Sequence, residues 1–98
     1  GEKIFAEEVE QALLRHPAVR DCVVAGRPSR RWGNEVVAIV ALEDRPDATA
    51  VTDEELLDVA AGHIARYKLP KAIVRRDVLQ RSPSGKADYR WAAAQAGA

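Results

Sequence analysis

A lysine that follows a turn rich in proline, serine and glycine is the feature of this sequence most suited to chemistry. The segment Ser82-Pro83-Ser84-Gly85-Lys86 has the composition of a turn and lies at the edge of a basic stretch. An ammonium group on a flexible stem can meet phosphate or carboxylate oxygens as negative charge develops on them. Exposed lysines in turns are common, so the candidate catalytic role of Lys86 depends on its context.

The charge is balanced over the whole chain but uneven within it. The 98 residues carry 15 lysines and arginines and 15 acidic residues, and this neutrality argues against a nucleic-acid partner. Residues 66–90, however, contain eight lysines and arginines and two aspartates, an excess of six positive charges. This stretch is either a solvated basic face or a surface that meets a polyanion, for which phosphates are the usual case.

Other catalytic patterns are absent from the sequence. There is no HExxH, no GxxxxGK[ST] and no serine–histidine–aspartate set with nucleophile-elbow glycines. Cys22 is the only cysteine, which excludes an internal disulfide and a zinc-ligand cluster, so no metal site is predicted. Its apolar neighbours favour a small buried side chain over a reactive thiol. His16 is interpreted as a helix-end residue.

The sequence contains no apolar run near the roughly 20 residues that a transmembrane helix needs. No charged-then-apolar leader opens it, and no Ser-Lys-Leu signal closes it. A chain without disulfides also fits a reducing compartment. We therefore expect a soluble, cytoplasmic protein with no transmembrane segment.

Three helices are predicted from apolar periodicity and from capping residues. The first ends at His16-Pro17, and its inward face consists of Phe5, Val9, Ala12 and Leu13. Its outward face consists of Glu7, Glu8, Glu10 and Gln11. The second begins at Thr52, whose side chain can cap the free amides while Val51 packs against Leu56. The third covers residues 88–96, where alanines favour a helix.

Three short apolar runs predict strands at residues 19–25, 36–42 and 72–74. Residues 26–29 are predicted as a turn, and residues 43–50 as a loop because they show no periodicity. The order is therefore helix, strand, strand, helix, strand, helix. It predicts a small α+β domain in which helices flank a three-stranded sheet.

Five segments, in the same order, resemble the C-terminal domain of the AMP-forming adenylating superfamily, which includes acyl- and aryl-CoA ligases, luciferases and peptide-synthetase adenylation domains. The resemblance covers residues 1–91, and the close of the chain is most similar to bacterial fatty-acyl-CoA ligases. The segments that carry it are Gly1-Glu2-Lys3-Ile4, EVE at 8–10 with LLRHPAV at 13–19, VVAGRP at 23–28 with Trp32-Gly33, YKLPK at 67–71, and SPSGK at 82–86.

The resemblance implies that two domains share the reaction. A large N-terminal domain, absent from residues 1–98, binds ATP and the carboxylic acid, and Mg²⁺ is expected with it. This chain would be the single mobile C-terminal domain, inactive alone, whose Lys86 bridges carboxylate and α-phosphate oxygens while acyl-AMP and pyrophosphate form. The domain then rotates, and its opposite face, including Gly1, Glu2 and Lys3, lines the channel by which CoA reaches the adenylate.

The resemblance also implies residues for the nucleotide end of CoA. An aromatic side chain at Trp32 can stack on adenine, and the positions of Tyr67 and Lys71 lie near the nucleotide. The alternative is that Trp32 anchors a turn and that Lys71 is merely solvated. Further phosphate candidates are Arg27, Arg30 and Arg31.

The sequence departs from the family pattern at two positions. Asn34 separates Glu35 from the Trp-Gly pair, which puts in doubt any role tied to that glutamate. Gln80 stands where some members carry a proline associated with regulatory acylation of the lysine. Two alternative functions stay open: an adenylation domain that loads a carrier protein, and a non-catalytic basic interaction module.

Overall fold

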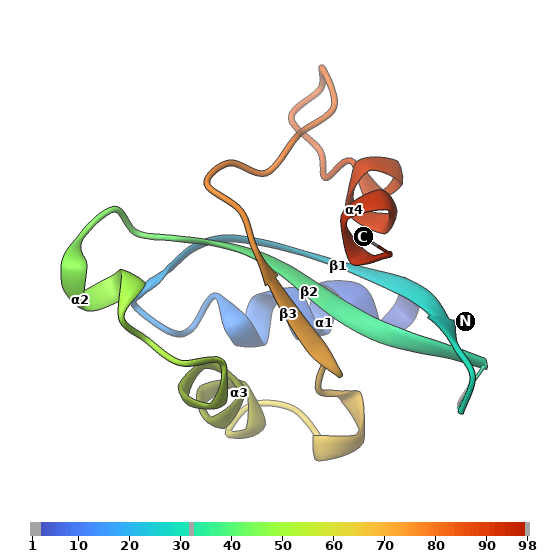
Figure 1. Ribbon diagram of the computed structural model, residues 1–98, viewed down its shortest axis with the longest axis horizontal. Coiled ribbons are helices and arrows are strands. Elements are labelled where there is room, and N and C mark those ends of the chain that lie inside the picture. Colours follow the sequence, from blue (N-terminus) through green and yellow to red (C-terminus); the bar gives the residue numbers. More distant parts are fainter. Residues whose placement is uncertain (1–2, 32, 98) are drawn as a thin grey trace.

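A three-stranded sheet forms the centre of the fold and has helices on both faces (Figure 1). The computed structural model describes residues 3–31 and 33–97, except the side chains of residues 3–5. The elements are α1 (Lys3–Leu13), β1 (Val19–Ser29), β2 (Gly33–Leu42), α2 (Pro46–Thr49), α3 (Asp53–Ala61), the short 3₁₀ helix η1 (Arg66–Lys68), β3 (Ala72–Arg75) and α4 (Tyr89–Ala96). The predicted α+β class with a three-stranded sheet is confirmed.

The strand order is β1-β2-β3, so β2 is the central strand. β1 and β2 pair antiparallel, with Val24 opposite Ala38, and β2 and β3 pair parallel, with Ile39 opposite Val74. A parallel pair requires a long crossover connection, which α2, α3 and η1 provide.

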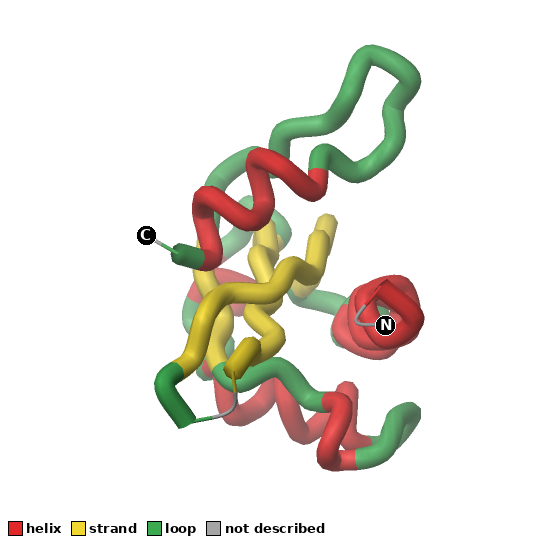
Figure 2. The backbone as a smooth tube through the Cα atoms, turned by 90° about the vertical axis from the view of Figure 1, so that its right-hand side faces the viewer, coloured by secondary structure: helices red, strands yellow, loops and turns green. Residues whose placement is uncertain are grey.

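The central strand is buried on both faces. Successive side chains of a strand alternate, so Val37 and Ile39 point to one face while Ala38 and Val40 point to the other, and all four are fully buried. The first pair packs against α4, and the second pair packs against α1 and α3. Figure 2 shows α1 and α4 on opposite sides of the strands. The sheet thus holds α4 and α1 in fixed relation to each other.

The start of α3 follows the predicted capping chemistry. The Thr52 hydroxyl accepts a backbone N–H of the first turn of α3 at 3.1 Å, and Val51 and Leu56 are both buried in one cluster. Asp88 caps α4 and accepts the N–H of Trp91 at 3.0 Å. The last helix therefore begins one residue later than predicted, with Asp88 as its cap.

The first helix was largely predicted correctly. Its backbone α-helix ends at Leu13, and a hydrogen-bonded turn continues to His16. The Nδ1 atom of His16 accepts the N–H of Ala18 at 3.0 Å, which gives this histidine the expected helix-end role. Val9 and Leu13 of the predicted inward face are fully buried, whereas the side chain of Phe5 lies outside the described residues.

Two predictions of irregular structure were wrong. Residues 26–29 continue β1 instead of forming a turn, because they pair with residues 33–36. Pro28 is tolerated there because β1 is an edge strand, where a missing N–H costs no ladder bond. Residues 43–50 contain α2, a single turn in which Pro46 occupies the first position, where its N–H would have no helical partner.

Candidate active site

Lys86 lies in a loop that projects from the body of the protein between β3 and α4 (Figure 1). This lysine loop, residues 82–86, closes on itself because the N–H of Ser82 donates to the carbonyl of Lys86 and that of Gly85 donates to the carbonyl of Ser82, each at 2.9 Å. Gly85 has a φ of +85°, a left-handed conformation that glycine adopts readily. A Cβ atom at Gly85 would meet nothing within 4 Å. The loop therefore stands clear of the other elements.

The Lys86 side chain is exposed, as predicted from the turn composition. Within residues 3–31 and 33–97, its ammonium group has no hydrogen-bond or ion-pair partner. A lysine ammonium is a compact charge on a flexible stem, and here no acceptor among the described side chains and backbone groups neutralises it. Lys86 is therefore available to an anion that binds outside this chain.

The base of the lysine loop is fixed to the domain. The backbones of Arg81 and Ala87 form an antiparallel bridge, and the Gln80 amide donates to the Asp88 carboxylate at 3.1 Å. The Arg81 guanidinium also donates to the Asp21 carboxylate of β1. An exposed lysine is thus carried on a short loop with an anchored base.

Glu10 is buried, so the prediction that it points outward was wrong. The residue is only 8% exposed. Its Oε2 atom accepts hydrogen bonds from the N–H of Val24 at 2.8 Å and from the hydroxyl of Tyr89 at 3.2 Å. Ala6 and Leu14 lie one turn before and one turn after it and pack against the core. This flanking by apolar residues is the sequence signal that places Glu10 at the edge of the inward face.

Several groups determine the pKa of Glu10. Burial is the largest single influence and raises the pKa, whereas the hydrogen bonds from the Val24 N–H and the Tyr89 hydroxyl lower it; the net shift is upward. The nearby charge of Glu7 raises the pKa further, and that of Arg81 lowers it. The carboxyl group therefore keeps its proton to a higher pH in the folded chain than in the unfolded chain.

We expect Glu10→Gln to become more favourable to stability as the pH rises. The wild-type group contributes its full stability below the unfolded pKa of about 4.3, and that contribution is lost as the pH rises through the higher folded pKa. Glutamine does not titrate. In urea unfolding between about pH 4 and pH 8, the unfolding free energy of the variant should rise relative to that of the wild type as the pH increases.

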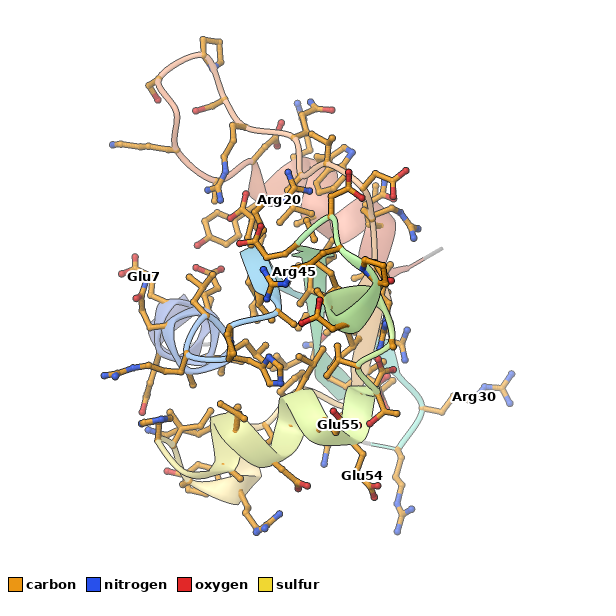
Figure 3. All side chains as sticks on the ribbon, turned by 90° about the vertical axis from the view of Figure 1, so that its left-hand side faces the viewer. Glu7, Arg20, Arg30, Arg45, Glu54 and Glu55 are labelled. Carbon is orange, nitrogen blue, oxygen red and sulfur yellow. The ribbon has the colours of Figure 1, made fainter. Side chains whose placement is uncertain are left out.

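The matched control for this titration is Glu54→Gln, because Glu54 is exposed on α3 and points away from the body of the protein (Figure 3). A difference between Glu10→Gln and the wild type that does not change with pH, or that changes equally in Glu54→Gln, would contradict the raised pKa of Glu10.

The basic stretch of residues 66–90 is to a large extent engaged in contacts within the domain. At least four of its eight cationic side chains donate hydrogen bonds to side chains of other elements: Lys68 to Glu8, Arg75 to Asp53, Arg76 to Gln95 and Arg81 to Asp21. The hydrogen bond to Glu8 raises the pKa of Lys68. These contacts favour the interpretation of the stretch as a structural, solvated face, from which Lys86 stands apart.

The segment with the predicted CoA residues Tyr67 and Lys71 lies at the opposite end of the molecule from the lysine loop (Figures 1 and 2). Tyr67 is 74% exposed, and Lys71 is exposed as well. The N–H of Lys71 donates to the carbonyl of Val36 at 2.7 Å, which attaches this segment to the first half of β2. The structure therefore brings Tyr67 and Lys71 into one segment and separates both from Lys86.

Three predicted residues lie outside the described part of the chain, namely Gly1, Glu2 and Trp32. Lys3 is the first residue of α1, and its side chain is not described. Their roles in the CoA channel and in adenine stacking stay predictions.

Arg27, a predicted phosphate candidate, has structural partners. Its Nε atom donates to Glu35 at 2.7 Å across the β1–β2 pair, and its Nη1 atom donates to the carbonyl of Ala96 at 3.2 Å. Arg27 and Glu35 stand directly opposite in the register, so Glu35 has a structural role despite the intervening Asn34. Arg30 lies at the β1–β2 turn and points away from the body of the protein (Figure 3).

A cleft of about 510 Å³ opens where α1 and α4 meet the strands β1 and β2. Its lining includes two carboxylates, those of Glu7 and Glu35, together with the Tyr89 ring and apolar residues. Glu35 is paired with Arg27, so Glu7 is the lining carboxylate whose charge would repel the phosphates of a nucleotide.

Other chemistry is not assembled in the described residues. Burial raises the pKa of the Cys22 thiol, and the charges of Glu10 and Asp21 raise it further, so this cysteine is unreactive, as predicted. Within the described ranges, no three His, Cys, Asp or Glu side chains gather as a metal site. No helix in the described part of the chain is long and apolar enough to cross a bilayer.

Two curated relatives match nearly the whole chain. The medium-chain acyl-CoA ligase Mig of Mycobacterium avium is 67% identical over 96 residues, which are 98% of this chain and 17% of that protein. The 3-oxocholest-4-en-26-oate–CoA ligase of Rhodococcus rhodochrous is 50% identical over 97 residues, which are 99% of this chain and 17% of that protein. The chain thus spans about a sixth of the length of these relatives.

The fold also matches that of a solved enzyme. A fatty acyl CoA synthetase of Mycobacterium tuberculosis matches with a TM-score of 0.81 and 28% identity, over 92% of this chain and 17% of that chain. The family model for the C-terminal domain of AMP-binding enzymes matches residues 8–86, which include the lysine loop. The chain therefore belongs to the AMP-binding enzyme C-terminal domain family.

Proposed function

We propose that the protein containing this chain is an ATP-dependent, AMP-forming acyl-CoA ligase, and that residues 1–98 are its mobile C-terminal domain. The observation that carries the proposal is the exposed ammonium group of Lys86 on an anchored loop, at the position of the lysine in the family's closing motif. The relatives that match nearly the whole chain are named as CoA ligases. ATP, the acid and any Mg²⁺ would bind in the part of the protein outside this chain.

Lys86 would act in the first half-reaction. A carboxylate oxygen of the acid attacks the α-phosphorus of ATP, the bond from that phosphorus to the bridging oxygen breaks, and pyrophosphate leaves. Two anions must approach each other in this step, and negative charge is spread over the phosphate oxygens. An ammonium group held between the carboxylate and the α-phosphate offsets this repulsion where it is largest.

The second half-reaction would use the other end of the domain. The CoA thiolate attacks the acyl carbonyl carbon, and AMP leaves with the electron pair of the broken carbon–oxygen bond. Tyr67 and Lys71 are exposed at the end opposite the lysine loop (Figure 1). A rigid domain cannot present two opposite ends to one active site at the same time. This separation supports a rotation of the domain between the two steps.

The substrate would be a fatty acid or a related carboxylate. The two curated relatives are named for a medium-chain acyl group and for 3-oxocholest-4-en-26-oate, although their matching regions are 67% and 50% identical to this chain. Relatives that share this domain thus differ in their acids. The choice of acid would therefore lie with the larger part of the protein.

Two alternative functions fit the observations less well. A basic interaction module would present its cations to a partner, whereas Lys68, Arg75, Arg76 and Arg81 are bonded within the domain. An adenylation domain that loads a carrier protein would use Lys86 in the same way, but the relatives' names favour CoA as the acyl acceptor.

The assay of the whole protein with ATP, CoA and a series of fatty acids tests this proposal. We expect AMP, pyrophosphate and acyl-CoA in equal amounts, with formation of each dependent on the acid. Deletion of residues 1–98 should abolish acyl-CoA formation. Release of ADP and phosphate would contradict the proposal, and so would acylation of a carrier-protein pantetheine without any acylation of CoA.

A further inference from the structure

We propose that Glu10 and Tyr89 are positioning residues for Lys86, because their hydrogen bond fixes one limb of the lysine loop to α1 and β1. The inference rests on the proposed role of Lys86 in adenylation and extends it to the groups that determine where this lysine lies.

The contact joins three elements through one carboxylate. Tyr89 begins α4 three residues after Lys86, and its hydroxyl donates to Glu10 Oε2 at 3.2 Å while lying 3.4 Å from Oε1. The N–H of Val24 donates to the same Oε2 atom at 2.8 Å, which holds the carboxylate against β1. A buried carboxylate that loses one of its donors is left partly unsatisfied, so the contact resists opening.

The lysine loop has few other connections to the body of the protein. Its internal hydrogen bonds join loop residues to one another, and a Cβ atom at Gly85 would meet nothing within 4 Å. At its base, Leu79 and Ala87 pack against the core cluster that holds Ile39. The polar connections there run from Arg81 to Asp21 on one limb and from Tyr89 to Glu10 on the other. A displacement of about 1 Å in a reacting group can lower a rate by about 100-fold, so loosening one limb should be visible in catalysis.

Tyr89→Phe removes one hydroxyl and leaves the ring in place, so it tests the contact without opening a cavity. In the whole protein we expect kcat of acid-dependent pyrophosphate exchange to fall about three- to tenfold. The KM for ATP and the rate of thioester formation from supplied acyl-adenylate should both stay within about twofold, because neither depends on Lys86.

Substitutions at Glu10 provide the rescue test. Glu10→Ala should show the same selective loss of pyrophosphate exchange as Tyr89→Phe. Glu10→Gln keeps an acceptor for Val24 and a partner for Tyr89, so it should recover most of the rate. The matched control is Gln11→Ala, the next residue of α1, which is exposed and should behave as the wild type. Failure of glutamine to recover any of the rate would overturn the proposal.

The Lys86→Ala background shows whether the contact acts through the lysine. There, Tyr89→Phe should change the remaining exchange rate by less than about twofold, because two residues that act through one group are not additive. An equal loss in both backgrounds would overturn the proposal, as would an unchanged rate in Tyr89→Phe alone. If Lys86→Ala itself leaves exchange intact, it is the proposed function that fails.

Limited proteolysis follows the loop without any chemistry of the active site. Trypsin cleaves after lysine, so the rate of cleavage after Lys86 in the folded whole protein, read by mass spectrometry, reports how often the loop opens. We expect cleavage about three- to tenfold faster in Tyr89→Phe than in the wild type, and an unchanged rate in Gln11→Ala. Equal cleavage in Tyr89→Phe and the wild type would overturn the positioning role even if Lys86 proved not to be catalytic.

Discussion

Lys86→Ala in the whole protein is expected to lower acid-dependent pyrophosphate exchange by about 100- to 1,000-fold. The substitution removes the positive charge that would lie between the carboxylate and the α-phosphate, and the exposed loop offers no second cation at that position. The loss should appear mainly in kcat, because the charge matters most when the two anions are forced together. Alanine at this exposed position should leave the fold intact.

Arg90→Ala is the matched control for this experiment. Arg90 is also basic and exposed, and it lies in the first turn of α4, four residues beyond Lys86. Its loss should change exchange by less than about threefold, because water and salt screen the charge of an exposed side chain that does not contact the reacting groups. Lys86→Arg should recover little of the exchange rate, since a planar guanidinium differs from an ammonium in shape and hydration. An equal loss in Arg90→Ala and Lys86→Ala would mean that general basicity, and not this lysine, supports adenylation.

Ile39→Ala is expected to lower the unfolding free energy of the chain by about 2–5 kcal/mol. Ile39 is 0% exposed on the central strand and packs in the cluster that also holds Ala92 and Ala96 of α4. Its truncation leaves a cavity between the sheet and α4. A typical domain has about 5–15 kcal/mol of stability in total, so this loss is a large fraction of it. Urea unfolding of the 98-residue chain measures the change.

Val78→Ala is the control for the core substitution, because Val78 is also aliphatic but is 71% exposed. Its truncation should change stability by no more than about 0.5 kcal/mol. A small effect of Ile39→Ala, comparable with that of Val78→Ala, would contradict the burial of β2 against α4. A large effect of Val78→Ala would instead contradict the exposure of the Val78 side chain.

The parts of the fold that depend on local chemistry were predictable from the sequence. Thr52 indicates a helix start because its short side chain can accept a backbone N–H group, and it caps α3 in the structure. The apolar run at residues 36–42 predicts a strand buried on at least one face, and the structure shows that both faces are buried. The α+β class then follows from the order of the elements.

The parts that depend on distant contacts were not predictable in the same way. Residues 26–29 have a turn composition, but pairing with β2 overrides that preference and extends the strand. The hydrogen-bond partner of Glu10 is a tyrosine 79 residues away, and no local pattern reports such a partner. The Arg81 guanidinium likewise donates to Asp21 of β1, which lies 60 residues earlier in the chain.

The candidate site was predicted unevenly for the same reason. The composition of the turn indicates an exposed lysine, but only the resemblance of five segments to a known family assigns it a reaction. The residues that hold the loop, Glu10 and Tyr89, were missed because their proximity is a property of the packed domain. Tyr67 and Lys71, the predicted CoA residues, are exposed in the structure, and their role stays a prediction.

In the proposed mechanism, one domain serves two half-reactions through two different ends. The most direct test compares, on one preparation of the whole protein carrying Lys86→Ala, thioester formation from supplied acyl-adenylate and CoA with pyrophosphate exchange. We predict that thioester formation stays within about threefold of the wild type while exchange collapses, because Lys86 lies at the end of the domain away from Tyr67 and Lys71. Equal losses in both half-reactions, or no loss in either, would contradict the account.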